Sequence, residues 1–169
     1  LVKRIAMAFG GRQYSLSAPG LLGSAQELEA LRGQREVAHI FSLFQNISLS
    51  VSGIGSFYPR PTSPLSRLPY LTEGEYTALV KHQPYGDLML RFIDSNGTEC
   101  ESELVSRTLA IDMESYLRIP RKLIVASGCE KSHTLKAALR GQLADVLIID
   151  SALARALYDI GDGVPAYGE

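Results

Sequence analysis

The feature that most constrains the fold is the alternation of short apolar strands with helices in the last third of the chain. Residues 123–126 (LIVA) and 146–149 (VLII) are uninterrupted apolar runs, and each is followed by a segment with helical periodicity, 130–140 and 152–158. Strands that are buried on both faces of a parallel sheet have this continuous apolar pattern. The pattern predicts an α/β fold with a Rossmann-like, mainly parallel sheet flanked by helices. Both strands should be central and almost inaccessible to solvent.

The first two thirds of the chain predict further helices and an embedded antiparallel hairpin. Two capping boxes, one at Ser24 with Glu27 and one at Thr72 with Glu75, mark helix starts. The Asn96-Gly97 dipeptide predicts the turn of a hairpin whose first strand is 87–93. The remaining expected elements are helices at 1–9, 25–33 and 37–46, and strands at 13–17 and 47–52.

Composition excludes several classes of protein. The 17 Lys and Arg residues nearly balance the 18 Asp and Glu residues, so the chain has no overall charge that would attract nucleic acid or a membrane surface. No apolar run is long enough to span a bilayer. The two cysteines make no disulfide framework, and the three histidines lack ligand spacing. We therefore expect no metal, no cofactor, no membrane partner and a cytoplasmic location.

The start of the sequence predicts that the chain is part of a longer protein. Residue 1 is Leu, and residues 1–9 have the pattern of a helix interior without a capping residue before it. We expect residues 1–160 to form the C-terminal part of a domain. The polar, Gly-rich residues 161–169 should form a loosely ordered tail.

Candidate binding residues follow the predicted strands, because ligands of open α/β sheets bind beyond the carboxyl ends of the strands. Gly53 and Gly55 follow one strand, and Ser127 and Gly128 follow another. Lys131 lies in the first turn of the next helix, where a cation opposes the helix dipole unless an anion is bound. By spacing alone, the Gly53-Gly55 pattern is more typical of a tight turn, and the position of Lys131 is more typical of a surface lysine offset by Glu130.

Two acidic residues are ambiguous on the same grounds. Asp87 follows Gly86 at the start of a strand, where a turn residue and a ligand contact are both consistent with the pattern. Asp150 follows the last strand and has the position of a helix N-cap. His133 lies two residues after Lys131 on a different helix face, which indicates a structural role.

Several motifs occur together in a fixed order and cover most of the chain. The sequence resembles the C-terminal effector domain of the sorbose-operon-regulator (SorC) family of bacterial transcriptional regulators. The motifs that carry this resemblance are Ala18-Pro19, Gly53-Ile54-Gly55, Gly86-Asp87, Phe92 to Gly97, Ile119 to Lys131, Ala137 to Gly141, Val146 to Asp150 and Ala154 to Leu157.

The resemblance implies a fold akin to sugar-phosphate isomerases and a domain that binds a phosphorylated sugar or related metabolite. It implies that Asp87 and Lys131 contact this effector, with Ser127, Gly128, Gly53 and Gly55 beside them. It also implies a homo-oligomer, and operator DNA binding through a separate N-terminal domain. That DNA-binding domain and the first Gly-rich loop of the effector domain are expected to lie outside these 169 residues.

Two other functions stay open at this point. A relative of sugar-phosphate isomerases or deaminases could use Asp87 as a general base and Lys131 as an electrostatic stabiliser of an enediol. A single Asp without a second carboxylate or His is a small catalytic set, so we expect no catalytic residues. The third function is a dimerisation module with a pocket that binds nothing.

Overall fold

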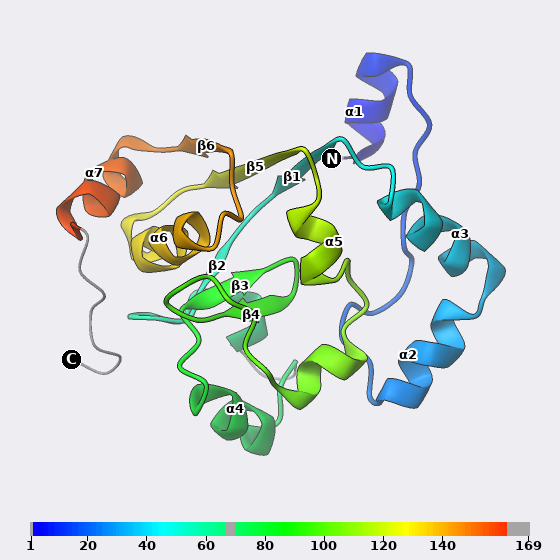
Figure 1. Ribbon diagram of the computed structural model, residues 1–169, viewed down its shortest axis with the longest axis horizontal. Coiled ribbons are helices and arrows are strands. Elements are labelled where there is room, and N and C mark those ends of the chain that lie inside the picture. The colour runs from blue at the N-terminus through cyan, green and yellow to red at the C-terminus, as the bar shows by residue number, and fades with distance from the viewer. Residues whose placement is uncertain (1, 67–69, 162–169) are drawn as a thin grey trace.

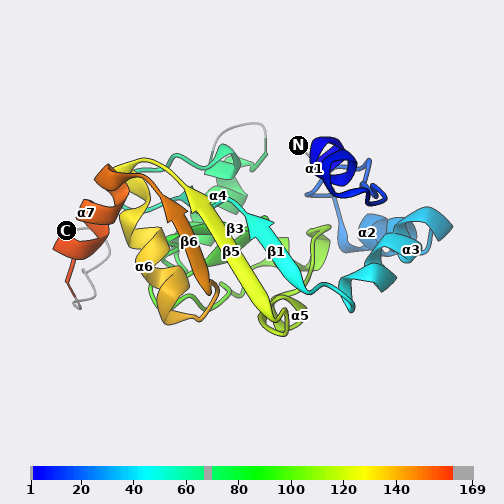
Figure 2. The same ribbon diagram turned by 90° about the horizontal axis from the view of Figure 1, so that it is seen from above.

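The computed structural model describes residues 2–66 and 70–161, and its centre is a three-stranded parallel sheet. The strand order is β1 (Leu49–Ser52), β5 (Arg121–Ala126), β6 (Val146–Ile149), so β5 is the middle strand. Figure 2 shows this sheet with its three arrows side by side. The α/β class and the parallel pairing of the two apolar strands are confirmed.

A second, smaller sheet lies beneath the first in the view of Figure 1. It is antiparallel and contains β2 (Gly55–Ser56), β3 (Gly86–Leu88) and β4 (Arg91–Ile93). Because β2 follows β1 after only two residues, the chain passes directly from the parallel sheet into the antiparallel one. This short connection brings the two sheets together at the carboxyl end of β1.

The helices form where the sequence supplies caps and apolar stripes. Thr72 and Glu75 make the predicted capping box, with the Thr72 N–H donating to the Glu75 carboxylate at 2.7 Å. Ser24 accepts from the Glu27 N–H at 3.2 Å. The helices are α1 (Val2–Phe9), α2 (Ala25–Arg32), α3 (Arg35–Phe44), α4 (Glu73–Val80), α5 (Met113–Leu117), α6 (Ser132–Arg140) and α7 (Ser151–Asp159), with 3₁₀ turns at Pro64–Ser66, Glu103–Arg107 and Cys129–Lys131.

The main core lies on one face of the parallel sheet, which we call the inner face. Ile124 of β5, Leu135 of α6 and Leu153 of α7 are fully buried there. α6 covers this face and also contacts β2 and β4, so it packs between the two sheets. The buried helix α6 therefore begins directly beside the junction of the sheets.

The prediction that both apolar strands are central and inaccessible is wrong. β6 is an edge strand, and its Val146 and Ile148 are 38% and 54% exposed. Val125 of the middle strand is 44% exposed. The apolar runs indicate strands made to be covered on both faces, but in this structure only the inner face is covered (Figure 2).

The predicted reversal at Asn96-Gly97 is present, but the predicted strand 87–93 is divided by a further hairpin turn at Met89-Leu90. Met89 and Leu90 both adopt positive φ, which makes the two-residue turn between β3 and β4. Bulky residues rarely adopt this conformation, so local sequence does not indicate the turn. At Asn96-Gly97 the chain reverses as predicted: the Asp94 N–H donates to the Thr98 carbonyl at 2.9 Å, and Glu99 makes an antiparallel bridge to Ile93.

The strand expected at residues 13–17 is not present. The nearest pairing is an isolated bridge from Leu21 to Thr108. The predicted tail falls almost wholly in 162–169, which lie outside the described residues. None of the helices within 2–66 and 70–161 has the length and apolar composition needed to cross a bilayer.

Candidate functional site

The candidate residues lie at the carboxyl ends of the parallel strands and on the adjoining antiparallel sheet. Gly53 follows β1 and lies beside β5, where an added Cβ would be 3.9 Å from the Val125 carbonyl oxygen. Ser127 and Gly128 follow β5. Gly53 and Ser127 are exposed at this edge. The common strand-end location expected from the sequence is therefore present.

Asp87 reaches the site from β3, directly opposite Gly55 of β2. A Cβ at Gly55 would collide with the Asp87 carboxylate and lie 2.8 Å from the Ser63 Cβ. A Cβ at Gly86 would collide with Thr134 of α6. Gly55 is needed because the Asp87 carboxylate occupies the space of a side chain there, and Gly86 is needed because α6 and the β2 backbone approach it closely.

The Asp87 carboxylate is in an unusual state for an acidic group. Its Oδ1 is shielded from solvent and accepts no hydrogen bond from any described residue. Burial raises the pKa of Asp87, while a hydrogen bond with Ser63 and the positive charge of Lys131 act in the opposite direction. A buried acceptor without a donor costs about 1–3 kcal/mol, so a conformational change that opened this oxygen to a ligand hydroxyl would be favoured by the new hydrogen bond.

Lys131 is brought to Asp87 by contacts between β2 and the 3₁₀ turn Cys129–Lys131. The Ser56 hydroxyl donates to the Glu130 carbonyl at 3.0 Å, which fixes this turn against β2. Lys131 is partly buried and is the N-cap residue of α6. Its charge acts to lower the pKa of Asp87, against the larger raising effect of burial, and adds to the lowering of the pKa of Asp150 by backbone hydrogen bonds. Asp87 and Asp150 are thus electrostatic neighbours of Lys131 at the start of α6.

The Gly128 backbone makes a contact within the chain itself. Its φ of +98° requires glycine, and its N–H donates to the Asp150 carboxylate at 2.8 Å. Asp150 also caps α7 by accepting from the Leu153 N–H at 2.7 Å. These two backbone hydrogen bonds lower the pKa of Asp150. The Gly128 amide thus already has an anionic partner from the chain itself.

The helix after Gly128 also begins later than predicted. Residues 129–131 form a 3₁₀ turn, and α6 begins at Ser132 instead of residue 130. Lys131 is therefore at the helix cap and not within the first α-helical turn. The Lys131 N–H donates to the Gly128 carbonyl at 3.2 Å, which is the spacing of a 3₁₀ turn.

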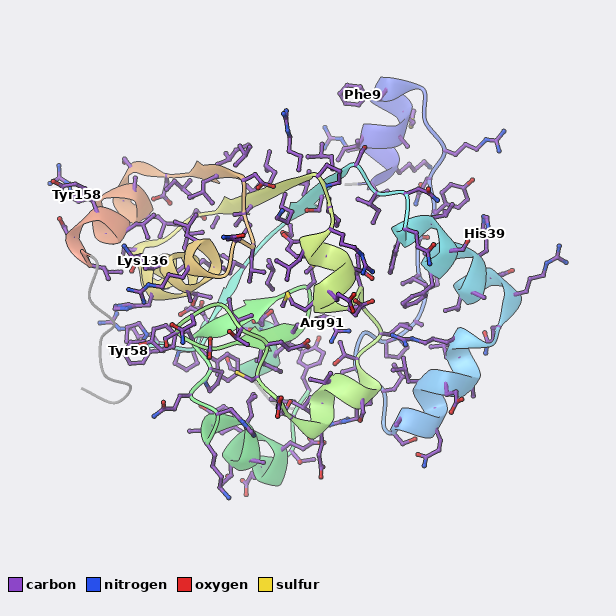
Figure 3. All side chains as sticks on the ribbon, in the orientation of Figure 1. Phe9, His39, Tyr58, Arg91, Lys136 and Tyr158 are labelled. Carbon is purple, nitrogen blue, oxygen red and sulfur yellow. The ribbon has the colours of Figure 1, made fainter. Side chains whose placement is uncertain are left out.

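His133 belongs to a group of aromatic side chains beside the site. Its ring makes edge contacts with Tyr58, at a centroid distance of 5.1 Å, and with Tyr85 at 6.3 Å. Burial lowers the pKa of His133. Figure 3 shows Tyr58 and Lys136 on the side of the molecule where α6 lies. These packing contacts agree with a structural role for His133.

The structure thus places Gly55 against the Asp87 carboxylate, and the charge of Lys131 acts on that carboxylate. Gly128 is linked to this group because its N–H donates to Asp150, on which the charge of Lys131 also acts. Ser63 is an additional residue that the sequence analysis missed, since a single serine in a proline-rich loop gives no signal. Gly53 and Ser127 share the strand-end edge. Within 2–66 and 70–161, no three His, Cys, Asp or Glu side chains group as metal ligands would.

Comparisons with known proteins agree on one family. Residues 1–159 match the family described as "Putative sugar-binding domain". The chain is 31% identical over 156 residues to the deoxyribonucleoside regulator of Bacillus subtilis, covering 92% of the chain and 49% of that protein. The chain therefore spans about half the length of this curated relative.

Solved structures show the same fold. A transcriptional regulator from Streptococcus pneumoniae has a TM-score of 0.84 and 27% identity, with 95% of this chain and 61% of that chain covered. The full-length sorbitol operon regulator SorC from Klebsiella pneumoniae has a TM-score of 0.80 and 22% identity, with 90% of this chain and 49% of that chain covered. At this identity the second likeness shows the fold alone.

Proposed function

Because the chain belongs to the sugar-binding domain family of SorC-type transcriptional regulators, we propose that it is the effector-sensing part of such a regulator. The proposed effector is a sugar or related carbohydrate metabolite, in its phosphorylated form. The relatives and structures compared above are transcriptional regulators, so they give no support to the isomerase or deaminase alternative.

The observation that carries this proposal is the buried, unpartnered Asp87 Oδ1 beside the Lys131 charge. In the effector-bound state a sugar hydroxyl donates a hydrogen bond to Asp87, and this requires that Oδ1 become accessible, because neighbouring protein atoms shield it in the structure without effector. Lys131 donates to the anionic part of the effector. Because the Gly128 N–H already donates to Asp150, we assign the anionic group to Lys131 and not to that amide.

Gly53, Gly55, Ser127 and Gly128 are proposed to shape the site at the strand ends. Gly55 leaves room for the Asp87 carboxylate, and Ser127 is exposed where a ligand hydroxyl could reach it. Effector binding then acts by linkage. An effector that binds one arrangement of the domain more tightly than the other shifts the equilibrium toward that arrangement. The size of the resulting change in DNA affinity is set by the ratio of the effector's affinities for the two arrangements. In this proposal the regulator is a homo-oligomer that works in the cytoplasm and binds operator DNA through a separate domain.

The test is a panel of ligands applied to the full-length regulator bound to its operator. Glucose 6-phosphate, fructose 6-phosphate, ribose 5-phosphate and 2-deoxyribose 5-phosphate are compared with their unphosphorylated sugars, and operator affinity is read by fluorescence anisotropy. We expect one phosphorylated sugar to change operator affinity by roughly 5–150-fold, the usual range of such coupling.

Matched variants separate the proposal from its alternatives. Asp87→Asn should abolish the response, whereas Glu36→Gln, an exposed carboxylate on α3, should leave it intact. A panel in which no sugar stabilises the protein or changes operator affinity would indicate the dimerisation module. Turnover of a sugar phosphate would indicate the enzyme.

A further inference from the structure

The neighbours that shield the Asp87 Oδ1 atom belong to two different kinds of structure. Asp87 lies on β3, the middle strand of the antiparallel sheet, and pairs with Gly55 of β2 on one side and Phe92 of β4 on the other. Backbone hydrogen bonds therefore fix its position from both sides. A Cβ placed at Gly55 would contact both this oxygen and the Ser63 Oγ, the latter at 2.9 Å. Of these neighbours, Ser63 lies in a loop and can move without breaking the sheet.

The loop that carries Ser63 has fixed ends and an exposed middle. Phe57 and Leu65 are buried in the same apolar cluster, so both ends of the loop are anchored. Between these anchors residues 59–61 are exposed, whereas Ser63 is fully buried. We call residues 59–64 the lid segment. Proline occupies three of its six positions and restricts φ there, so the segment keeps its shape when it moves between the anchors.

Hydrogen bonds hold the lid segment closed, but the closed arrangement leaves polar atoms without partners. The Ser56 carbonyl oxygen accepts from the Thr62 N–H at 2.9 Å and from the Ser63 N–H at 3.1 Å. The Ser63 Oγ accepts from the Leu65 N–H at 3.1 Å, so its own proton is available for Asp87. The Thr62 Oγ1 and the Asp87 Oδ1 are both shielded and have no hydrogen-bond partner among the described residues. Shielded polar atoms without partners make the closed arrangement costly, so a ligand that supplies a donor favours opening.

Ser56 also connects the lid segment to the cation of the site. Its buried hydroxyl lies 3.0 Å from the Tyr58 carbonyl oxygen and 3.0 Å from the Glu130 carbonyl oxygen. A hydroxyl has one proton to donate, so these two carbonyls share it. Tyr58 directly precedes the lid segment, and Glu130 belongs to the 3₁₀ turn that ends at Lys131. Movement of the lid segment therefore changes the contact that holds the Lys131 turn.

We propose that the lid segment is an autoinhibitory contact that the effector displaces, in which the Ser63 hydroxyl occupies the position that an effector hydroxyl takes on Asp87. This inference rests on the proposed function and adds to it the protein group with which the effector competes. Both competitors are hydroxyls, so the Asp87 carboxylate exchanges one donor for another. The effector also binds Lys131 through its anionic group, an interaction that Ser63 does not make, and this difference drives the exchange.

The first measurement follows the lid segment in the full-length regulator without any substitution. Hydrogen exchange is read by mass spectrometry in fragments within residues 57–66. The protein is measured alone and with saturating glucose 6-phosphate, fructose 6-phosphate, ribose 5-phosphate or 2-deoxyribose 5-phosphate. We expect the sugar phosphate that binds to make the Thr62 and Ser63 amides exchange at least about tenfold faster, because their hydrogen bonds to Ser56 open. A bound sugar phosphate that leaves this exchange unchanged, or slows it, would overturn the proposal.

The second measurement removes the competing hydroxyl. Ser63→Ala keeps the Cβ and deletes the donor, so isothermal titration should show the sugar phosphate binding about 2–12-fold more tightly, the factor that one net hydrogen bond gives. Ser106→Ala is the matched control, because its exposed hydroxyl donates only to the nearby Glu103 carbonyl, at 2.7 Å. This control should bind as the original protein does. If Ser63→Ala does not fold, as judged by circular dichroism, the exchange measurement decides alone.

Failure of the lid and failure of the proposed function give different results. Equal affinity of the original protein and Ser63→Ala for a sugar phosphate would overturn the lid and leave the effector site intact. Binding to Ser63→Ala alone would support the lid, since the hydroxyl then blocks the site in the original protein. Absence of binding to both proteins would overturn the proposed function, and the lid with it.

Discussion

At the residue scale, Asp87 is a carboxyl group whose ionisation the fold disfavours. Its pKa is raised above the ordinary value of 3.8 because the carboxylate is buried. The folded state therefore holds the proton more tightly than the unfolded state. The Asp87 contribution to stability is greatest below pH 3.8 and falls as the pH rises through the raised folded pKa.

Asp87→Asn should remove this dependence. We expect the difference in thermal midpoint, variant minus original protein, to increase as the pH is raised from about 4 to 7. The reason is that only the original protein loses stability through ionisation of Asp87. Thermal unfolding followed by circular dichroism in matched buffers measures this difference. A variant that loses stability equally at every pH would indicate that Asp87 serves to cap a turn.

Lys131 makes a separate prediction about the effector. Lys131→Ala in the full-length regulator should weaken binding of the active phosphorylated sugar by about 1.5–3 kcal/mol, the range for a hydrogen bond to a charged group. Operator binding without effector should be nearly unchanged. Lys81→Ala, an exposed lysine at the end of α4, is the matched control. Unchanged sugar affinity in isothermal titration of Lys131→Ala would contradict the role assigned to this residue.

At the scale of elements, the close contact between β3 and α6 places Asp87 beside the start of the helix. Gly86→Ala would force a Cβ against Thr134, whose hydroxyl donates to the Tyr85 carbonyl at 2.6 Å. We expect a loss of about 1–3 kcal/mol in unfolding free energy, as overpacking causes, together with weaker effector binding. Gly74→Ala in α4, where nothing lies within 4 Å, should instead stabilise by roughly 0.5–1 kcal/mol. Urea denaturation measures both, and equal effects would show that the contact is not tight.

At the scale of the whole molecule, the two faces of the parallel sheet should differ sharply in their contribution to stability. Ile124 on the inner face is fully buried, while Ile148 on the opposite, outer face is 54% exposed. In the 169-residue chain, Ile124→Ala should cost about 2–5 kcal/mol. Ile148→Ala should stay within about 1 kcal/mol because most of that side chain already contacts water. Comparable losses in urea denaturation would mean that the outer face is covered in the isolated chain.

Local signals determined much of the fold. The capping residues Ser24 and Thr72 start helices where predicted, because a cap needs only neighbouring backbone N–H groups. The LIVA and VLII runs form parallel strands because apolar β-branched residues suit that environment. The family resemblance named Asp87, whose half-buried side chain has an Oδ1 shielded from solvent.

Other features of the fold and the site depend on tertiary contacts and could not be predicted from local sequence patterns. The hairpin turn at Met89-Leu90 exists because long-range packing outweighs the poor turn propensity of those residues. Ser63, Ser56 and Asp150 join the site through contacts with residues distant in sequence. The sequence by itself determined which strands have two apolar faces. Which of those faces is covered depended on the elements available to pack against it, because burial is a property of the assembled layers and not of one strand.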